Sequence, residues 1–294
     1  MANEQPTSSA LQTAIRTIGI VGAGTMGLGI AQVCVQHGFV TVLFDINEEM
    51  LKKAQLAITA GLGKLVEKGR LTAPEQEAAL ARLRLTTDLS TVQAELIIEA
   101  VVEKLSVKHQ LFRELAVLNG PTTILASNTS SLPITRLAAP IQHPERVVGM
   151  HFFNPAPLMP LVEIIKGATT SAAVADTVYQ LALQLGKTPV YAADAPGFIV
   201  NRVARHFYVE GLKIAEEQVA PLEVIDELLE ATGFRMGPFR LMDLIGVDTN
   251  FSVTSAMYEA FHYDAKFRPS RIQQQKVDAG HHGRKTGKGF YEYS

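Results

Sequence analysis

The chain has 294 residues, of which 47% are hydrophobic and 19% are charged, a composition typical of a globular protein long enough for two domains. Its 27 Lys and Arg residues nearly balance its 29 Asp and Glu residues, and the net charge of −2 gives no electrostatic reason to expect nucleic acid or an anionic membrane as the main partner. No apolar run reaches membrane-spanning length. Cys34 is the only cysteine, which excludes an intrachain disulfide and argues against a cysteine-based metal site.

Residues 1–15 are rich in Ser, Thr, Gln and Ala, and we expect a flexible N-terminal extension. They lack the apolar stretch of a secretory signal and the arginine-rich pattern of a transit peptide. A cytoplasmic location is the simplest interpretation.

A nucleotide-binding pattern follows. Residues 17–21 predict a short buried strand, which runs directly into Gly22-Ala23-Gly24-Thr25-Met26-Gly27 and then into a helix that ends near Gly38. A second apolar strand, 40–44, is closed by Asp45. Strand, Gly-x-Gly-x-x-Gly, helix, strand and acid, in that order, predict a dinucleotide-binding unit, and a Gly-rich turn without a nucleotide is the alternative.

Each part of this pattern has a physical role. Gly22 permits a tight turn, Gly24 lets the backbone approach the pyrophosphate, and Gly27 lets the helix pack closely on the strand. The N–H groups at the helix start favour a bound phosphate. Asp45 lies 18 residues after Gly27, where it can bond a ribose 2′-hydroxyl and would repel a 2′-phosphate, so NAD is favoured over NADP.

Strands and helices then alternate up to residue 193. Strands are predicted at 83–86, 96–100, 124–126, 147–150, 161–165 and 188–191, and helices at 106–118, 172–185 and, as an inserted hairpin, 48–84. This alternation predicts an α/β fold with a parallel, doubly wound sheet of Rossmann type, in which ligands bind beyond the carboxyl ends of the strands. Four polar residues follow such ends, and we expect them to form one site: Glu103, Asn128, Ser130 and His151.

His151 lies in the segment Gly149-Met150-His151-Phe152-Phe153-Asn154-Pro155, between two apolar runs of which the second carries Glu163. Prolines 155, 157 and 160 prevent a continuous helix and predict a strand, a loop and a strand. His151 and Glu163 would then face each other on neighbouring elements, close enough to pair. A histidine oriented by a carboxylate can act as an acid/base, whereas a buried histidine beside a surface glutamate is the alternative.

A second, all-helical domain is predicted from residue 194, where Asp194-Ala195-Pro196-Gly197 interrupts the alternation. Its helices are expected at 198–217, 222–231, 238–245, 251–263 and 272–279. Apolar residues surround much of the first helix, which is consistent with burial against a partner subunit or inside its own domain. The predicted domains are therefore an extension (1–15), a nucleotide-binding domain (16–193) and a helical domain (194–294).

Six motifs together resemble the short-chain 3-hydroxyacyl-CoA dehydrogenases, including 3-hydroxybutyryl-CoA dehydrogenases, over residues 16–293. Besides the two already quoted, they are Ser127-Asn128-Thr129-Ser130-Ser131, Pro196-Gly197-Phe198-Ile199-Val200-Asn201-Arg202, Met236-Gly237-Pro238 and Gly283-Arg284-Lys285-Thr286-Gly287. The resemblance implies NAD as cofactor, oxidation of an (S)-3-hydroxyacyl-CoA to a 3-oxoacyl-CoA, and a homodimer formed through the helical domain.

The resemblance also implies roles at matching positions. His151 would be the catalytic acid/base, with Glu163 as its orienting partner. Two further polar residues match catalytic positions, Ser130, which also binds substrate, and Asn201, and one matches an active-site asparagine, Asn154. Other positions match cofactor contacts: Glu103, Lys108, Asn128 and Lys285.

Some positions bear on the acyl-CoA. Lys68 corresponds to a lysine near the CoA moiety, whereas Gly61 lies where some members have a serine that contacts CoA, and Pro160 where many have a lysine. The segment 233–251 is more similar to members from aromatic-acid degradation, some of which act on 3-hydroxyadipyl-CoA. Arg235 would then assist a dicarboxylic acyl chain or, alternatively, cap a surface loop.

Two other functions remain open. A sugar-acid or polyol dehydrogenase would use the same chemistry without CoA, and a non-catalytic NAD-binding sensor would retain only the fold. The intact set Ser130, His151, Glu163 and Asn201 favours an enzyme, because a binding module has no need for an acid/base pair.

Overall fold

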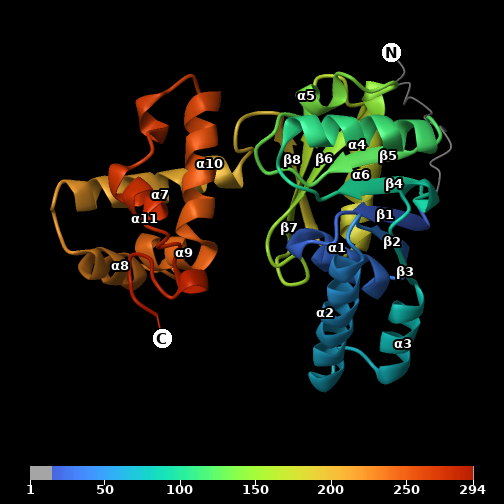
Figure 1. Ribbon diagram of the computed structural model, residues 1–294, viewed down its shortest axis with the longest axis horizontal. Coiled ribbons are helices and arrows are strands. Elements are labelled where there is room, and N and C mark those ends of the chain that lie inside the picture. Colours follow the sequence, from blue (N-terminus) through green and yellow to red (C-terminus); the bar gives the residue numbers. More distant parts are fainter. Residues whose placement is uncertain (1–14, 294) are drawn as a thin grey trace, which may run out of the picture. The chain divides into compact units, whose positions relative to one another are not determined.

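The computed structural model describes residues 15–293. These residues divide into two compact units, one ending at Asp194 and the other starting at Ala195 (Figure 1). The N-terminal extension predicted at residues 1–15 lies, except for its last residue, outside the described part of the chain.

The first unit is built on one eight-stranded sheet with the order β3-β2-β1-β4-β5-β6-β7-β8. Its strands are β1 (Thr17–Val21), β2 (Val40–Phe44), β3 (Leu83–Thr86), β4 (Leu96–Glu99), β5 (Ile124–Ser127), β6 (Val147–Phe152), β7 (Leu161–Lys166) and β8 (Thr188–Ala193). The doubly wound α/β fold is confirmed, with helices between most strands.

The expectation of a wholly parallel sheet is wrong at one edge. The strands β1 to β6 run parallel to one another, but β7 runs antiparallel to β6, and β8 is parallel to β7. Residues 153–160 are too few for the crossover that a parallel neighbour of β6 would need, so the chain must return in the opposite direction.

Six helices belong to this unit: α1 (Thr25–Gln36), α2 (Glu48–Glu67), α3 (Ala73–Ala81), α4 (Leu105–Leu118), α5 (Ile134–Ala138) and α6 (Ala172–Gln184). The predicted hairpin is α2 and α3, which extends away from the sheet (Figure 1). Asn47 accepts a hydrogen bond from the Glu49 N–H at the start of α2, and Thr72 and Glu75 form a capping box at the start of α3. The helix α5 and two short 3₁₀ turns, η1 (Leu89–Thr91) and η2 (Pro144–Arg146), lie in segments for which no helix was predicted.

Successive residues of the strands face opposite sides of the sheet, and in most strands both sides are buried. Ile20, Ile98 and Val148 belong to the core cluster that includes residues of α1, α2 and α6. Gly149 faces the other side, because a Cβ atom added there would lie 3.0 Å from the side chain of Ile134 in α5. In α2 the buried residues recur at helical spacing, at Leu51, Ala54, Ile58 and Leu62, so one face of the helix meets the core. The two faces of the sheet are therefore covered by different helices, and the residues of the site divide between them.

The second unit is helical: α7 (Val200–Glu216), α8 (Leu222–Ala231), α9 (Pro238–Ile245), α10 (Val247–Ala260), α11 (Arg271–Asp278) and the 3₁₀ turns η3 (Ala265–Phe267) and η4 (Arg284–Thr286). The helix α10 begins and ends earlier than the predicted 251–263, because Gly246, at φ 107°, lets the chain turn directly out of α9. Among the described residues, no helix combines the length and apolar character needed to cross a bilayer.

Two buried carboxylates fix this unit. The Asp226 carboxylate accepts hydrogen bonds from the N–H groups of Phe239 and Arg240 at the start of α9 and from the Tyr291 hydroxyl. Asp243 accepts bonds from two N–H groups and one hydroxyl of the C-terminal segment 290–293. Residues 290–293 are thereby held against α9 although they form no long strand.

Candidate active site

The turn between β1 and α1 has the geometry of a dinucleotide-binding loop. Gly22 is at φ 104°, and a Cβ atom added to it would lie 2.7 Å from the Ala100 oxygen. An added Cβ at Gly27 would lie 1.7 Å from the Gly22 oxygen, so only glycine fits there. At Gly24 nothing lies within 4 Å of such an atom. The backbone at Gly24 therefore stays open to a ligand, whereas the other two glycines let the loop close on itself.

The start of α1 suits an anion. Gly24 supplies no side-chain cap, and the first turn, which includes Thr25 and Met26, contains no acidic residue. Asp45 accepts the Ala23 N–H at 2.8 Å and the Asn47 N–H at 2.9 Å, which holds its carboxylate at the edge of the loop. A pyrophosphate at this helix start and a ribose hydroxyl on this carboxylate stay predictions.

Glu103 organises the loop that carries Ser130. One carboxylate oxygen of Glu103 lies 3.0 Å from the Ser130 nitrogen, 3.2 Å from the Ser131 nitrogen and 2.5 Å from the Thr129 hydroxyl. Burial raises the pKa of Glu103, but the Lys108 ammonium and these hydrogen bonds outweigh burial, so the pKa lies below the ordinary carboxyl value. Glu103 is therefore a fixed anion that connects the end of β4 with the loop after β5.

Lys108, predicted to contact the cofactor, is 1% exposed and lies beneath this loop. Its ammonium lies 2.7 Å from Glu99 and 3.0 Å from Glu103. Glu99, which is completely buried, also accepts a hydrogen bond from the Ser127 hydroxyl at 2.7 Å. Nothing in the local sequence marked Glu99, because it stands in an apolar strand. A direct contact of Lys108 with the cofactor stays a prediction, whereas its contact with Glu103 is present.

His151 and Glu163 stand directly opposite each other on β6 and β7. The His151 Nδ1 atom lies 2.7 Å from a Glu163 oxygen, and the two residues are 5% and 0% exposed. The predicted contact is therefore present, although His151 lies inside β6 rather than after it. Both residues occupy the face of the sheet that carries Gly149, which is the face that α5 covers. The alternative of a surface glutamate is wrong.

Asn128 connects the Ser130 loop with the histidine strand. Its side-chain oxygen accepts the Phe152 N–H at 2.8 Å, next to His151. Asn154 is exposed and begins the loop between β6 and β7. The carboxyl ends of three neighbouring strands thus bring together Glu103, Asn128, Ser130 and His151, as the alternation of strands and helices predicted.

Four other predicted residues take no part in the contacts described above. Asn201, in α7, and Lys285, in η4, belong to the second unit, and their contributions stay predictions. The Lys285 ammonium lies 2.6 Å from an Asp248 oxygen. Lys68, at the end of α2, and Arg235 are exposed.

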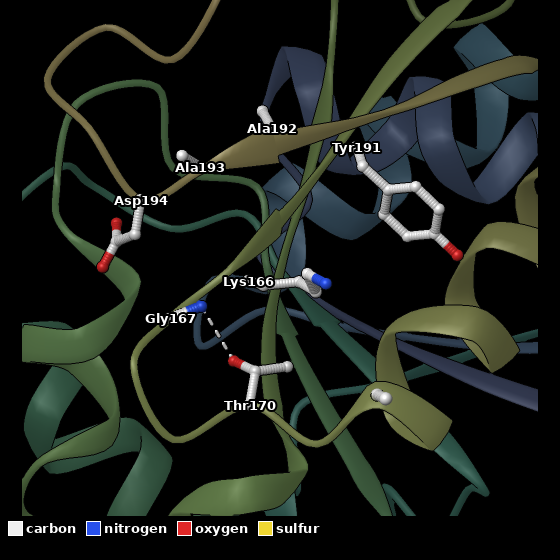
Figure 2. Close-up of a pocket in the computed structure, with 8 residues that line it drawn as sticks. Lys166, Gly167, Thr170, Tyr191, Ala192, Ala193 and Asp194 are labelled. Carbon is white, nitrogen blue, oxygen red and sulfur yellow. Dashed lines mark hydrogen bonds between the residues drawn. The ribbon is translucent and has the colours of Figure 1, made fainter.

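A surface hollow of about 510 Å³ lies at the carboxyl end of β7 (Figure 2). Lys166, Tyr191 and Asp194 line it, and Lys166 stands three residues beyond Glu163, toward the start of β6. The hollow is therefore separate from the histidine. Among residues 15–293, no three His, Cys, Asp or Glu residues are grouped to hold a metal ion.

The chain matches two family models in succession. The model for the NAD binding domain of 3-hydroxyacyl-CoA dehydrogenase matches residues 17–195, and the model for the C-terminal domain of 3-hydroxyacyl-CoA dehydrogenase matches residues 197–293.

Individual relatives indicate the same family as the two models. The chain is 48% identical to a 3-hydroxyadipyl-CoA dehydrogenase of Escherichia coli over 95% of its own length, and it spans 59% of that longer relative. It is 44% identical to a probable 3-hydroxybutyryl-CoA dehydrogenase of Deinococcus radiodurans, covering 94% of this chain and 99% of the relative. The crystal structure of an (S)-3-hydroxybutyryl-CoA dehydrogenase from Ralstonia eutropha has a TM-score of 0.92 at 40% identity, covering 96% of this chain and 100% of the other.

The resemblance seen in the motifs is thus confirmed over nearly the whole chain, including the cofactor-binding loop and the histidine strand. The chain belongs to the 3-hydroxyacyl-CoA dehydrogenase family.

Proposed function

We propose that this chain catalyses the NAD-dependent oxidation of short-chain (S)-3-hydroxyacyl-CoA, such as 3-hydroxybutyryl-CoA, to 3-oxoacyl-CoA, and the reverse reduction. The observation that supports this most directly is the buried His151–Glu163 pair, which stands beside the Ser130 loop on a sheet with a dinucleotide-binding turn. An acid/base pair at the carboxyl edge of such a sheet is what hydride transfer to or from a carbonyl requires.

In the oxidation direction His151 removes the proton of the 3-hydroxyl group. Glu163 accepts the hydrogen bond of Nδ1–H, which leaves Nε2 as the nitrogen that exchanges the proton, and it stabilises the imidazolium that forms. NAD, when bound, supplies the hydride acceptor. Ser130, Asn154 and Asn201 are proposed to bond the substrate oxygens and hold the reacting carbon in place. In reduction the protonated His151 returns its proton to the 3-oxo oxygen.

The proposal is tested by following NADH oxidation with acetoacetyl-CoA, free acetoacetate and sugar acids. Turnover of acetoacetyl-CoA is expected, and turnover of sugar acids alone would instead favour the dehydrogenase without CoA. A chain that binds NADH but turns over none of these substrates would be the sensor.

The roles of the pair are tested in the same assay. His151→Ala is expected to lower kcat by at least about 10²-fold while the Kd for NADH is retained. Glu163→Gln should keep the fold, seen by circular dichroism, and lower kcat. If His151→Ala lost NADH binding, the histidine would be structural, and full activity of Glu163→Gln would contradict the orienting role.

A dicarboxylic substrate, 3-hydroxyadipyl-CoA, is the second candidate. It is favoured by the 48% identity to the Escherichia coli 3-hydroxyadipyl-CoA dehydrogenase and by Arg235, whose exposed guanidinium offers a partner for a terminal carboxylate. The ratio of kcat/KM for 3-oxoadipyl-CoA to that for acetoacetyl-CoA should then fall in Arg235→Ala but not in a control, Arg268→Ala, at another exposed arginine. An unchanged ratio in Arg235→Ala would assign that arginine to the surface loop.

A homodimer formed through the helical unit and a cytoplasmic location complete the proposal. Large apolar side chains are exposed on this unit, including Val203 (69%), Val224 (40%) and Leu228 (62%), and such surfaces commonly mark subunit contacts. NAD and acyl-CoA thioesters are intracellular metabolites, which supports the location. Cell fractionation with an antibody to the chain would test it, and recovery outside the cytoplasmic fraction would contradict it.

A further inference from the structure

The loop between β6 and β7, residues 153–160, carries Asn154 and joins the strand of His151 to the strand of Glu163. Pro155, Pro157 and Pro160 have no N–H group, so the loop is poor in donors for its own carbonyl oxygens. Its inner residue, Ala156, is 2% exposed, whereas Leu158 is 74% exposed. The loop is therefore seated on the body of the unit at one point and open on its other side.

Lys187 donates hydrogen bonds to two carbonyl oxygens of this loop. It stands in the turn between α6 and β8 and is 8% exposed. Its ammonium lies 2.6 Å from the Ala156 oxygen and 3.0 Å from the Met159 oxygen. The next residue, Thr188, donates its N–H to the Pro160 oxygen at 2.8 Å. Two consecutive residues thus hold three carbonyl groups of the loop.

The same part of the loop contacts the cofactor-binding helix. A Cβ atom added to Gly29 in α1 would lie 3.3 Å from the Ala156 Cβ and 3.2 Å from the Pro157 Cδ, so the helix and the loop are already in close contact. Ala156 therefore contacts both α1 and the Lys187 ammonium.

Lys187 bonds backbone carbonyl groups of this loop rather than a carboxylate. Burial lowers the pKa of Lys187. A lysine that only filled space would be replaced at little cost by methionine, whereas this one places a buried cation on two carbonyl groups of one loop.

We propose that Lys187 is a positioning residue that holds the 153–160 loop against α1. It thereby keeps Asn154, His151 and Glu163 correctly placed relative to the cofactor-binding helix. The effect on turnover rests on the proposed dehydrogenase function, whereas the anchoring of the loop does not. Small displacements of positioning groups lower the rate of the reaction much more than they weaken binding.

The test compares the full-length wild type with Lys187→Met, which keeps the length of the side chain and removes its donors. We expect kcat/KM for acetoacetyl-CoA to fall about tenfold or more, with the Kd for NADH within about threefold of wild type. Hydrogen exchange measured by mass spectrometry should accelerate in peptides that cover 153–160. Lys166→Met, at an exposed lysine at the end of β7, is the matched control. It should leave kcat/KM, the Kd for NADH and the hydrogen exchange of the loop unchanged.

Two further variants separate positioning from general stability. Lys187→Arg retains a cation and should recover part of the lost activity. Gly29→Ala adds a methyl group against Ala156 and Pro157 without changing the lysine, and should lower kcat/KM with a similar loss of loop protection. This second variant also serves if Lys187→Met does not fold.

The proposal is overturned if Lys187→Met unfolds at lower temperature but keeps wild-type kcat/KM and wild-type exchange in the loop, because the lysine would then be structural only. If the wild type itself fails to turn over acyl-CoA, the proposed function fails, and the exchange experiment still decides whether Lys187 anchors the loop.

Discussion

Three ionisable side chains, Glu99, Glu103 and Lys108, contact one another next to the loop that carries Ser130 and are largely shielded from water. Glu99 and Lys108 are buried, and only Glu103, whose side chain is 35% exposed, reaches the surface. Two carboxylates and one ammonium leave one negative charge in excess, and Glu103 uses its carboxylate to hold the N–H groups of Ser130 and Ser131. Removing Lys108 would leave Glu99 as an unpaired buried charge, which is strongly destabilising.

This arrangement predicts a pH dependence. A carboxyl group whose pKa is lowered by folding contributes stability above its unfolded pKa and loses that contribution as the pH falls through its folded pKa. For Glu103 the loss should occur below pH 4.5, its ordinary value. The free energy of unfolding of Glu103→Gln, measured with urea, should therefore lie below that of the wild type at pH 7 and approach it near pH 3.

The matched control is Glu67→Gln, at an exposed glutamate at the end of α2. Its difference from the wild type should be small at both pH values, as is usual for exposed positions. An equal difference for Glu103→Gln at pH 7 and near pH 3 would show that its charge does not stabilise the loop.

Among the secondary-structure elements, one turn and one hairpin carry most of the residues proposed to take part in the reaction. The β1–α1 turn closes through Gly22 and Gly27 and presents open backbone at Gly24. The β6–β7 hairpin places His151 opposite Glu163, and a slip of one residue in this pairing would turn one side chain to the other face of the sheet. In the proposed reaction each element would contribute one half, the turn by binding the hydride carrier and the hairpin by moving the proton.

The turn yields a prediction from two substitutions with the same chemical change. Gly24 has φ −67° and no neighbour within 4 Å of an added Cβ, so Gly24→Ala should keep the wild-type Tm. It should nevertheless raise the Kd for NADH by about tenfold or more, since the methyl group would occupy the path of the pyrophosphate.

Gly27→Ala should instead lower Tm, because its methyl group collides with the Gly22 carbonyl oxygen in the absence of any ligand. Differential scanning fluorimetry and NADH titration distinguish the two outcomes. An unchanged Kd in Gly24→Ala would mean that the pyrophosphate does not approach this part of the backbone.

At the scale of the whole molecule, the proposed reaction draws on both units. His151 and Glu163 belong to the first unit, whereas Asn201 and Lys285 belong to the second. The second unit also exposes apolar side chains that its own core leaves uncovered, among them Val224 and Leu228, which are four residues apart on α8 and share a face. We therefore expect the helical unit to serve the site and the subunit contact together.

Charges on that face should prevent the subunit contact. The double variant Val224→Asp and Leu228→Asp is expected to elute as a monomer where the wild type elutes as a dimer, measured by size-exclusion chromatography with light scattering. Its helical circular dichroism should be retained, because both side chains are exposed in the single chain. Leu56→Asp, at a residue of α2 that is 72% exposed, is the control and should remain dimeric. A wild type that is itself monomeric would contradict the expectation.

Much of the fold could be predicted because its signals are local. The strand, loop and helix that contain Gly22, Gly24 and Gly27 are consecutive, and the prolines between His151 and Glu163 predict a loop between two strands. Helical periodicity and capping residues placed α2 and α3 in the same way. These features depend on neighbours in the sequence, and for that reason the α/β class, the Gly-rich turn and the candidate acid/base pair could be predicted before the structure was known.

The burial of polar groups and their contacts became known from the three-dimensional packing alone. Nothing in the sequence distinguishes Lys187 from a surface lysine, but its ammonium bonds the carbonyl oxygen of Ala156, 31 residues away. The Ser127 hydroxyl likewise bonds the Glu99 carboxylate, 28 residues away. The reversal of β7 and β8 relative to the other strands likewise became visible only in the sheet. The physical reason is that desolvation and hydrogen-bond partners are set by whatever packs around a side chain, and packing brings together residues whose separation along the chain carries no pattern.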